Sequence, residues 1–375
     1  MERRTFIKTA IITGAALNIG GLLMASKPQA IGIPDIAYNS LPKWRGFNLL
    51  EKFTHKPGEW KNVAPEWGFK NEPFRESDFA MIREFGFNFV RLPMSYKCWC
   101  AEDDWYKLKE KHLKEIDQAV EYGKQYDLHV CINFHRSPGY TINDVAFLPQ
   151  YREKTSIWDD DDALKACAFH WKHFAERYKG IPNKMVSFNL FNEPYRTTVA
   201  KHDHVIRYLV DAIRSIDPNR LIAIDGFNFH PSYSLLDLKI AQCARGYNPH
   251  VVTHYKAAWS SGNDTFPTWP MKDAQGVLWN KDKLVERSQE WLNIEKKGVG
   301  VYVGEFGVYN KTPHEVTLRF LNDALDIWKT NKWGWAMWCF RGSFGIADSG
   351  RPDVKYEKYK GIMLDRKMLE LLKIF

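Results

Sequence analysis

Two carboxylates stand at the ends of apolar, strand-like runs and offer acid–base chemistry. Glu193 closes the run SFNLFNE and is followed at once by Pro194, and Glu305 lies in the run VYVGEFG. One carboxylate does little chemistry alone, but a pair held on facing elements supplies both a general acid and a base or nucleophile. The first question is therefore whether the remaining elements hold these two side chains in comparable places.

Short apolar runs alternate with amphipathic helical runs from residue 42 to residue 375. Eight apolar runs predict strands: Trp44–Leu49, Phe87–Leu92, His129–His135, Val186–Glu193, Leu221–Gly226, His250–Tyr255, Val299–Phe306 and Gly334–Phe340. Helix-like spacing predicts helices over Glu76–Phe85, Lys109–Tyr126, Ala163–Tyr178, His202–Ile216, Ser234–Arg245, Lys283–Lys296, Glu315–Lys329 and Met368–Ile374. This alternation predicts an α/β fold, a single (β/α)8 TIM barrel with long β-to-α loops. A doubly wound open sheet would need a Gly-rich phosphate turn after an early strand, and the sequence has none.

Polar residues gather at one end of these predicted strands, where a barrel places its functional groups. Side-chain alternation predicts that Val301, Val303 and Glu305 share one face of their strand. The same alternation places Glu193 on one face with Ser187, Asn189 and Phe191. Two carboxylates from the fourth and seventh strands, facing each other across a narrow barrel mouth, meet the requirement for glycoside hydrolysis.

The runs RLP, NFH, NEP and GEFG, followed by a tryptophan on the last strand, resemble the motifs of glycoside hydrolase family 5, the cellulase family. The resemblance extends from about residue 42 to residue 375, and Arg91, His135 and Trp338 narrow it from the larger barrel clan to this family. It implies a retaining hydrolase of β-linked glucan or mannan-type saccharides, of the endo-β-1,4-glucanase kind. It also implies an oligo- or polysaccharide as the partner, a monomer, and no metal or organic cofactor.

The resemblance also assigns roles to individual residues. Glu193 would be the general acid/base, so its pKa should be raised by burial or by its neighbours. Glu305 would be the nucleophile, and Arg91 is the candidate to keep it ionised. A retaining double displacement predicts carboxyl groups about 5–5.5 Å apart. Substrate contacts would come from Asn192 to the sugar 2-OH, from His135 and His254, and from Trp338 as a platform for the apolar face of the sugar.

One position departs from the family pattern. The family commonly has His-x-Tyr at the end of the sixth strand, with the tyrosine touching the nucleophile. In this sequence the predicted sixth strand ends in His254–Tyr255–Lys256, so Lys256 stands where tyrosine is expected. Three alternatives remain open: a bulge brings Tyr255 into the site, Lys256 enters it, or another group serves.

Three long loops rich in aromatic residues should shape the substrate cleft. They are 51–75 with Trp60 and Trp67, 136–159 with Tyr140, Tyr151 and Trp158, and 256–281 with Trp259, Trp269 and Trp279. We expect them to wall off part of the cleft and to favour short or terminal substrates over open-chain polysaccharide. The alternative is that half of these aromatic side chains merely pin the loops to the barrel.

Residues 1–30 have the pattern of an export signal and leave 31–375 as the catalytic domain. Arg3–Arg4, Phe6 and Lys8 precede an apolar stretch from Ala10 to Ala25, as in the twin-arginine signal. An ordinary secretory signal or a membrane anchor is the alternative. A twin-arginine signal predicts a periplasmic or extracellular protein, because this route exports proteins that have already folded.

Composition excludes several other classes. The net charge is +8, but the charged residues are interspersed and form no basic stripe, which argues against a nucleic-acid partner. The six cysteines lack the paired spacing of a zinc site and are expected to be buried or semi-buried free thiols. Three rivals remain: an exo-acting β-mannosidase or β-glucosidase, a catalytically inactive carbohydrate-binding barrel, and an exported redox protein, for which we find no cofactor ligands.

Overall fold

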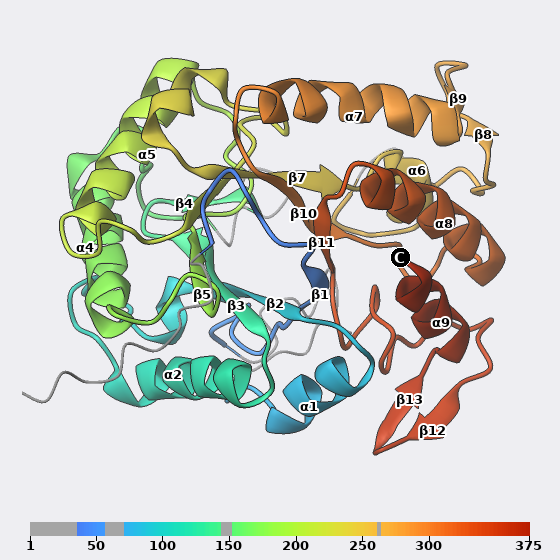
Figure 1. Cartoon of the computed structure of the whole chain (residues 1–375), viewed down its shortest axis with the longest axis horizontal. Helices are drawn as coiled ribbons and strands as arrows, with labels where there is room; N and C mark the ends of the chain where they lie inside the picture. The colour runs from blue at the N-terminus through green and yellow to red at the C-terminus, as the bar shows by residue number, and fades with distance from the viewer. Residues whose placement is uncertain (1–35, 57–70, 144–151, 261–263) are drawn as a thin grey trace, which may run out of the picture. The chain divides into compact units, whose positions relative to one another are not determined.

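Eight parallel strands close into a barrel at the centre of the structure, as Figure 1 shows. The structure, a computed structural model, describes residues 36–56, 71–143, 152–260 and 264–375. Each barrel strand pairs in parallel with the next one along the chain, and the first pairs with the last. The barrel strands are β1 (Arg45–Asn48), β2 (Phe89–Ser95), β3 (His129–Ser137), β5 (Val186–Asn189), β6 (Ile222–Asp225), β7 (Ala241–Gly246), β10 (Val301–Phe306) and β11 (Gly334–Met337). The predicted (β/α)8 TIM barrel is therefore confirmed.

Helices surround the barrel and separate its strands along the chain (Figure 1). Helix α4 begins after Asp160, whose side chain accepts hydrogen bonds from the backbone N–H groups of Asp162 and Ala163. Thr198 and Asn280 cap α5 and α7 in the same way. Within the described residues the helices are α1 (Glu76–Glu84), α2 (Glu110–Gln125), α4 (Asp161–Arg177), α5 (Val199–Arg214), α6 (His250–Thr253), α7 (Lys281–Glu295), α8 (His314–Thr330) and α9 (Arg366–Ile374), with 3-10 turns η1 (Tyr96–Cys98) and η3 (Tyr233–Leu238). Short strands in the loops are β4 (Tyr140–Thr141), β8 (Met271–Lys272), β9 (Leu278–Trp279), β12 (Glu357–Tyr359) and β13 (Ile362–Leu364).

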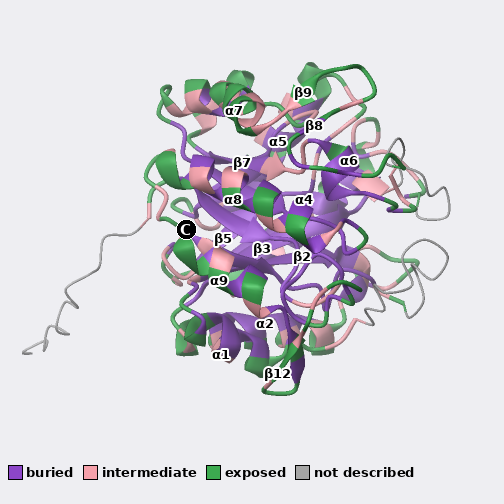
Figure 2. Ribbon diagram, turned by 90° about the vertical axis from the view of Figure 1, so that its right-hand side faces the viewer, coloured by how far each residue is buried: buried purple, intermediate pink, exposed green. Residues whose placement is uncertain are grey.

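Two apolar cores flank the wall of the barrel. The outer core lies between strands and helices, and Figure 2 shows it as a buried layer beneath exposed helix faces. The inner core fills the amino-terminal half of the barrel, where Trp44 stacks on Phe89 at 4.9 Å between ring centroids and meets Tyr302 edge-on at 5.5 Å. This inner core forms an apolar floor beneath the carboxyl ends of the strands.

The sixth barrel strand is not where the sequence predicts it. Residues 241–246 form β7, although the spacing predicts a helix over Ser234–Arg245, and the predicted strand His250–Tyr255 contains the short helix α6. The run AQCARG lacks the β-branched residues that mark strands, but pairing with β6 and β10 on either side makes it one. The valines of HVVTHY pack into the outer core from a helical turn that begins after Pro249.

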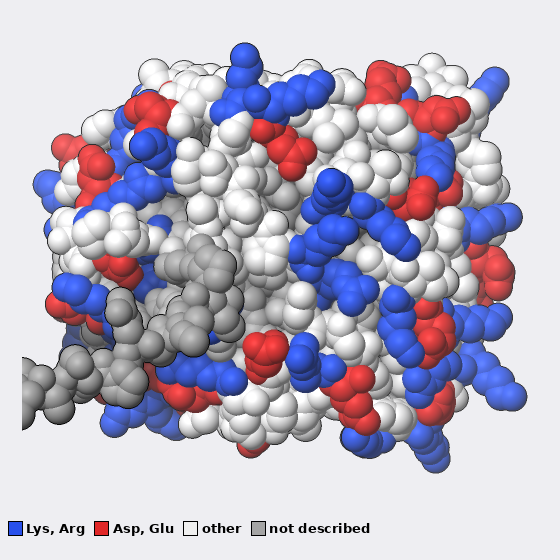
Figure 3. Space-filling model, in the orientation of Figure 1, with Lys and Arg blue, Asp and Glu red and all other residues white. Residues whose placement is uncertain are grey.

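Several sequence predictions concern segments outside the barrel or the protein as a whole. The signal at residues 1–30 and the domain boundary at residue 31 lie outside the described residues and stay predictions. Within the described residues, no helix combines the length and apolarity needed to cross a membrane. All six cysteines are buried free thiols, as expected. On the face that Figure 3 displays, Lys and Arg side chains are interspersed with Asp and Glu.

Candidate active site

A layer of polar side chains crosses the barrel at the carboxyl ends of its strands. Because the strands run parallel, these ends meet at one mouth, above the inner core. Seven of the eight strands contribute a member, and hydrogen bonds or ion pairs join the members across the barrel. The layer consists of Asn48 (β1), Arg91 (β2), Asn133 (β3), Asn189 (β5), Asp225 (β6), Arg245 (β7) and Glu305 (β10).

Arg91 holds the centre of this layer and is fully buried. Its Nη1 donates hydrogen bonds to Glu305 Oε1 at 2.5 Å and to Asn48 Oδ1 at 2.9 Å. Its Nη2 donates to Asn192 Oδ1 at 2.9 Å, and its Nε donates to Asn189 Oδ1 at 3.1 Å. The guanidinium is thereby fixed in place, and the sequence prediction that Arg91 lies against Glu305 agrees with this geometry.

Glu305 points into the barrel because a β-bulge turns it there. Val301 and Val303 belong to the outer core, so regular alternation would aim Glu305 outward with them. The pairing of β10 with β7 shifts between Val303 and Glu305, leaving Gly304 as the extra residue. The predicted shared face of Val301, Val303 and Glu305 is therefore wrong, although the predicted inward direction of Glu305 is right.

Glu193 reaches the site from a turn rather than from a strand. Strand β5 ends at Asn189, four residues before the predicted end, and Glu193 adopts a left-handed backbone conformation with φ of 48°. Two contacts hold this turn: the Glu193 N–H donates to Asp225 Oδ2 at 2.8 Å, and Tyr140 Oη donates to the Glu193 carbonyl at 2.6 Å. Burial raises the pKa of the Glu193 carboxyl to about 7; the cation of Arg245 opposes this rise, and Glu305 and Asp225 add to it.

Arg245 lies between the two carboxylates and is a site residue that the sequence analysis missed. Its Nε donates to Glu193 Oε1 at 2.7 Å, and its Nη2 lies 3.4 Å from Glu305 Oε1. The same Nη2 donates to Asn192 Oδ1 at 2.9 Å and forms an ion pair with Asp225. The Arg245 side chain is only 6% exposed, so one buried cation touches three carboxylates.

Tyr247 is the second missed residue, and it corrects the prediction at Tyr255. Tyr247 Oη donates to Glu305 Oε2 at 3.3 Å, which is the contact predicted for a tyrosine at the end of the sixth strand. Tyr255 instead packs against Phe266, at 5.9 Å between ring centroids, and Lys256 Nζ lies 5.2 Å from the Tyr255 ring centroid. Neither Tyr255 nor Lys256 lines the cavity that lies above the polar layer. The third of the three alternatives therefore holds: another residue, Tyr247, makes the contact with Glu305.

This cavity above the polar layer has a volume of about 400 Å³. Glu193, Glu305, His135, His254 and Trp338 line it, as the sequence predicts, whereas Arg91 and Asn192 lie beneath its surface. The Nδ2 group of Asn192 is buried and has no hydrogen-bond partner among the described residues. The remaining walls come from Phe53, Ile142, Asn143, Tyr195, Arg196, Phe229, Tyr247, His250, Trp259, Ser260 and Phe344.

Aromatic rings form one wall of this cavity. His135 packs against Trp338 and Phe53, at 5.5 and 4.4 Å between ring centroids. Burial and the cations of Arg91 and Arg245 lower the pKa of His135 well below its ordinary value, so the ring is neutral. His254 follows α6 rather than a strand, and burial with the neighbouring His250 lowers its pKa as well.

The loop aromatics divide between the cavity and the barrel surface. Of the predicted set, Trp60, Trp67 and Tyr151 lie outside the described residues. Trp259 lines the cavity, whereas Trp158 packs on Tyr140 and Phe191 beside it. Trp269 donates to Asp323 of α8, and Trp279 donates to Asp273 within its own hairpin. Most of the described loop aromatics therefore pin loops, which is the alternative that the sequence left open.

The sequence of the chain matches the family model "Cellulase (glycosyl hydrolase family 5)" over residues 48–343, well over half of its length. The chain belongs to glycosyl hydrolase family 5. It is 27% identical over 311 residues to endoglucanase C of Acetivibrio thermocellus, covering 75% of this chain and 88% of that protein. It is 26% identical over 302 residues to a probable glucan 1,3-β-glucosidase A of Emericella nidulans, covering 71% of each. A solved structure described as a glycoside hydrolase is 36% identical, with a TM-score of 0.80 over 88% of this chain and 99% of that one. The protein is therefore a cellulase-type glycoside hydrolase.

The corrected sixth strand also corrects the departure from the family pattern. In this family 5 enzyme, β7 and the residue after it read Arg245–Gly246–Tyr247, so the expected tyrosine is present and an arginine takes the place of the histidine. The spacing Arg-x-Tyr is present in the sequence, but it could be recognised as the family motif only if the sixth barrel strand had been placed at residues 241–246.

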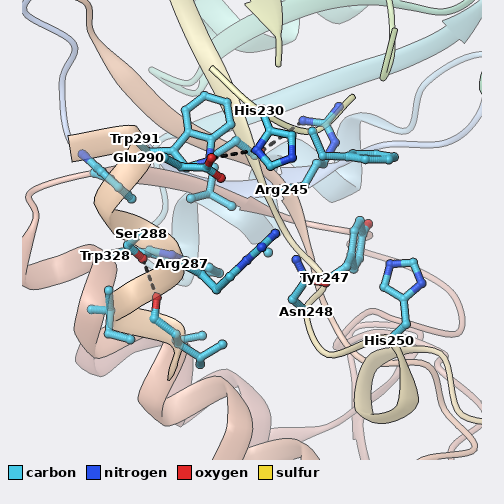
Figure 4. A pocket seen from close by; sticks show the side chains of 18 of the residues that line it. His230, Arg245, Tyr247, Asn248, His250, Arg287, Ser288, Glu290, Trp291 and Trp328 are labelled. Carbon is cyan, nitrogen blue, oxygen red and sulfur yellow. Dashed lines mark hydrogen bonds and ion pairs between the residues drawn. The ribbon is translucent and has the colours of Figure 1, made fainter. Parts of the chain in front are cut away.

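A second cavity, of about 220 Å³, lies on the outer side of the same segment. Figure 4 shows Arg245 and Tyr247 on one side of it and Arg287, Trp291 and Trp328, from α7 and α8, on the other. A Cβ on Gly246 would approach the Trp328 ring to 2.7 Å, so only glycine lets the segment lie this close to α8. The packing of α8 thus helps to hold Arg245 and Tyr247 against the polar layer at the barrel mouth.

Proposed function

We propose that this enzyme hydrolyses β-linked glucan or mannan-type saccharides with retention of configuration, with Glu193 as acid/base and Glu305 as nucleophile. One observation carries the proposal: two carboxylates meet at one mouth in different environments. Glu305 lies against the Arg91 guanidinium, while burial raises the pKa of Glu193 to about 7. Separated environments of this kind assign one carboxyl as acid and the other as ionised nucleophile.

Glycosylation and deglycosylation follow from these assignments. In the first step a Glu305 oxygen bonds to the anomeric carbon while the glycosidic C–O bond breaks, and Glu193 gives its proton to the leaving oxygen. In the second step Glu193 takes a proton from water, whose oxygen attacks the anomeric carbon and releases the Glu305 carboxylate. We expect the carboxyl groups to be about 5–5.5 Å apart, as this mechanism requires.

The cavity residues have substrate roles in this proposal. The unpaired Nδ2 of Asn192 is a donor for the sugar 2-OH. Trp338 offers an apolar platform, and His135 and His254 contact substrate hydroxyls as neutral rings. These roles need no metal or organic cofactor.

The favoured substrate is a β-1,4-glucan, which the family resemblance implies, and the name of the endoglucanase relative supports a glucan. An exo-acting β-glucosidase or β-mannosidase is the second candidate, because the cavity of about 400 Å³ is near the lower end of the range for small-ligand sites, about 300–1,000 Å³.

We further propose export through the twin-arginine signal at residues 1–30, to be tested by cell fractionation with and without Arg3 and Arg4.

A panel of aryl β-glycosides and β-1,4 oligosaccharides tests the function, with Glu305→Ala as the control variant. We expect activity on at least one β-glycoside, the β-anomer as first product by NMR, and loss of turnover in Glu305→Ala. Full activity of that variant, or an α-anomer as first product, would contradict the mechanism. Random internal cuts in long polymer would support the endo-acting form over the exo-acting one.

A further inference from the structure

In the proposed active site of this enzyme one cation, Arg245, contacts both proposed catalytic carboxylates. Arg245 Nε is 2.7 Å from Glu193 Oε1, and Arg245 Nη2 is 3.4 Å from Glu305 Oε1. Arg91 contacts Glu305 at 2.5 Å, but no ion pair joins it to Glu193 among the described residues. The two arginines are therefore not equivalent: only Arg245 can interact directly with whichever carboxylate is ionised.

In double displacement the negative charge changes places between these carboxylates. The free enzyme holds it on Glu305 while Glu193 carries a proton. In the glycosyl-enzyme intermediate Glu305 is an uncharged ester, and Glu193, having given its proton to the leaving group, is ionised. The pair carries one negative charge in both states, so a cation within reach of both can neutralise it throughout without moving.

We propose that Arg245 is the shared counter-ion of Glu193 and Glu305 and positions ionised Glu193 as the base of the second half-reaction. The proposal rests on the retaining mechanism proposed above. Arg245 acts through the two carboxylates and is a positioning residue, not a group that reacts with the sugar. Its predicted effect falls mainly on deglycosylation, where Glu193 must be ionised.

Asp225 fixes Arg245 in this role. It forms an ion pair with Arg245 Nη2, accepts the Glu193 N–H at 2.8 Å, and accepts Asn189 Nδ2 at 3.0 Å. With Asp225 ionised, the two arginines balance Asp225 and the single charge of the catalytic pair. The titratable or charged groups around Arg245 and Glu193 are Arg91 (β2), His135 (β3), Tyr140 (β4), Asp225 (β6), Cys243 (β7), Tyr247 (after β7) and Glu305 (β10).

An arginine suits this position better than the histidine usual in the family. The charge of a histidine side chain depends on pH near neutrality, whereas an arginine side chain is protonated at all ordinary pH values. A guanidinium stays protonated: burial lowers the pKa of Arg245, but Asp225 and Glu305 outweigh it and the pKa stays well above its ordinary value. The positive charge is therefore present at every working pH.

The test compares Arg245→Met, Arg245→Gln and Arg245→Lys with 2,4-dinitrophenyl β-glycosides, whose leaving group needs no acid. For Arg245→Met and Arg245→Gln we expect a burst of dinitrophenolate followed by a steady state slowed at least about tenfold, because Glu193 is a less available base. The apparent pKa of the acidic limb of the kcat–pH profile should rise by about one unit. Arg245→Lys keeps the charge and should restore that limb.

Matched controls separate this role from a structural one. Arg177→Met removes a guanidinium that also bridges two carboxylates, Glu110 and Asp117, each at 2.6 Å, but between α2 and α4 on the outside of the barrel. Its pH profile should match the wild type, and thermal unfolding checks that all variants fold. If Arg245→Met does not fold, the Gln and Lys variants decide.

Two outcomes are distinguishable. If Arg245→Gln and Arg245→Lys share one pH profile with the wild type, or if both half-reactions slow equally with no shifted limb, Arg245 is only a brace and the inference is overturned. If the wild type turns over no aryl β-glycoside at all, the proposed function itself fails.

Discussion

The β-bulge at Gly304 allows a sharp test of how the fold orients Glu305, the proposed nucleophile. An alanine Cβ at position 304 would lie 2.2 Å from Cys243 Sγ and 3.3 Å from Arg245 Nη1. The first distance is far inside van der Waals contact, and Cys243 belongs to the packed inner core. Gly304→Ala must therefore either push β10 away from β7 or displace the thiol.

The cost can be worked from general packing energies. Overpacking a buried site costs about 1–3 kcal/mol, and each kcal/mol lowers Tm by about 2–4 °C in domains of 150–250 residues. A 1 Å displacement of a catalytic group costs about 100-fold in rate. We therefore expect Gly304→Ala to lower Tm by several degrees and kcat by about two orders of magnitude, measured by thermal unfolding and aryl β-glycoside hydrolysis.

Cys243→Ala provides the matched second variant, because it removes the sulfur that the new Cβ would meet. We expect the double variant to be more stable than the sum of the single variants by about 1–2 kcal/mol, a coupling normal for residues in contact. If Gly304→Ala alone kept wild-type Tm and kcat, or if the two substitutions were simply additive, close packing at Gly304 would not be what aims Glu305.

Three further predictions test other parts of the structure. Burial, followed by Asp78, raises the pKa of Glu51 from 4.5 to about 7. The folded state therefore binds the Glu51 proton more tightly, and the contribution of Glu51 to wild-type stability should fall by about 3 kcal/mol as pH rises from about 4.5 to about 7. In urea titrations at about pH 5 and about pH 8, the wild type should lose more unfolding free energy between the two pH values than Glu51→Gln does, and equal losses would count against the prediction. Tyr247→Phe should lower kcat/KM about tenfold, because it removes the hydrogen bond from the Tyr247 hydroxyl to Glu305. Tyr255→Phe should leave kcat/KM unchanged. A larger effect of Tyr255→Phe than of Tyr247→Phe would favour His250–Tyr255 as the sixth strand. Phe229 lines the cavity, is 41% exposed and lies 5.7 Å from the Tyr195 ring centroid. Phe229→Ala should therefore raise KM for β-1,4 oligosaccharides about fivefold, and an unchanged KM would show that Phe229 does not contact the substrate.

The sequence was sufficient to identify site residues that belong to strong motifs. It was not sufficient to identify site residues whose position depends on how the strands pair. Strands β2 and β3 contain apolar runs that lead to Arg91 and His135, so both strand and site residue were readable. Strand β7 was not readable, because Ala241, Cys243 and Arg245 face a crowded interior in which small and polar side chains replace β-branched ones. Because β7 was not predicted from the sequence, Arg245 and Tyr247 were not identified as site residues.

The direction of Glu305 was predicted correctly for a wrong reason. Alternation cannot foresee a bulge, since the extra residue exists only in the register between two strands. Glu193 is similar: its left-handed φ and its contacts with Asp225 and Tyr140 depend on β6 and on the loop after β3. Local sequence gives the identity of both carboxylates, but neighbouring elements aim them.

The polar layer is best understood as one charged unit rather than as a list of residues. Buried charges cost more in desolvation than they return unless each is paired, and removing one partner leaves the other exposed to that cost. Here Arg91 and Arg245 face Asp225, Glu193 and Glu305, and in the proposed mechanism the last two share one negative charge, so the charges of the layer balance. The members of the layer are buried above the apolar inner core, where the low local dielectric strengthens these interactions and makes every member sensitive to its neighbours. A single substitution in the layer therefore changes folding stability and catalytic pH dependence together, because both depend on the same charge balance.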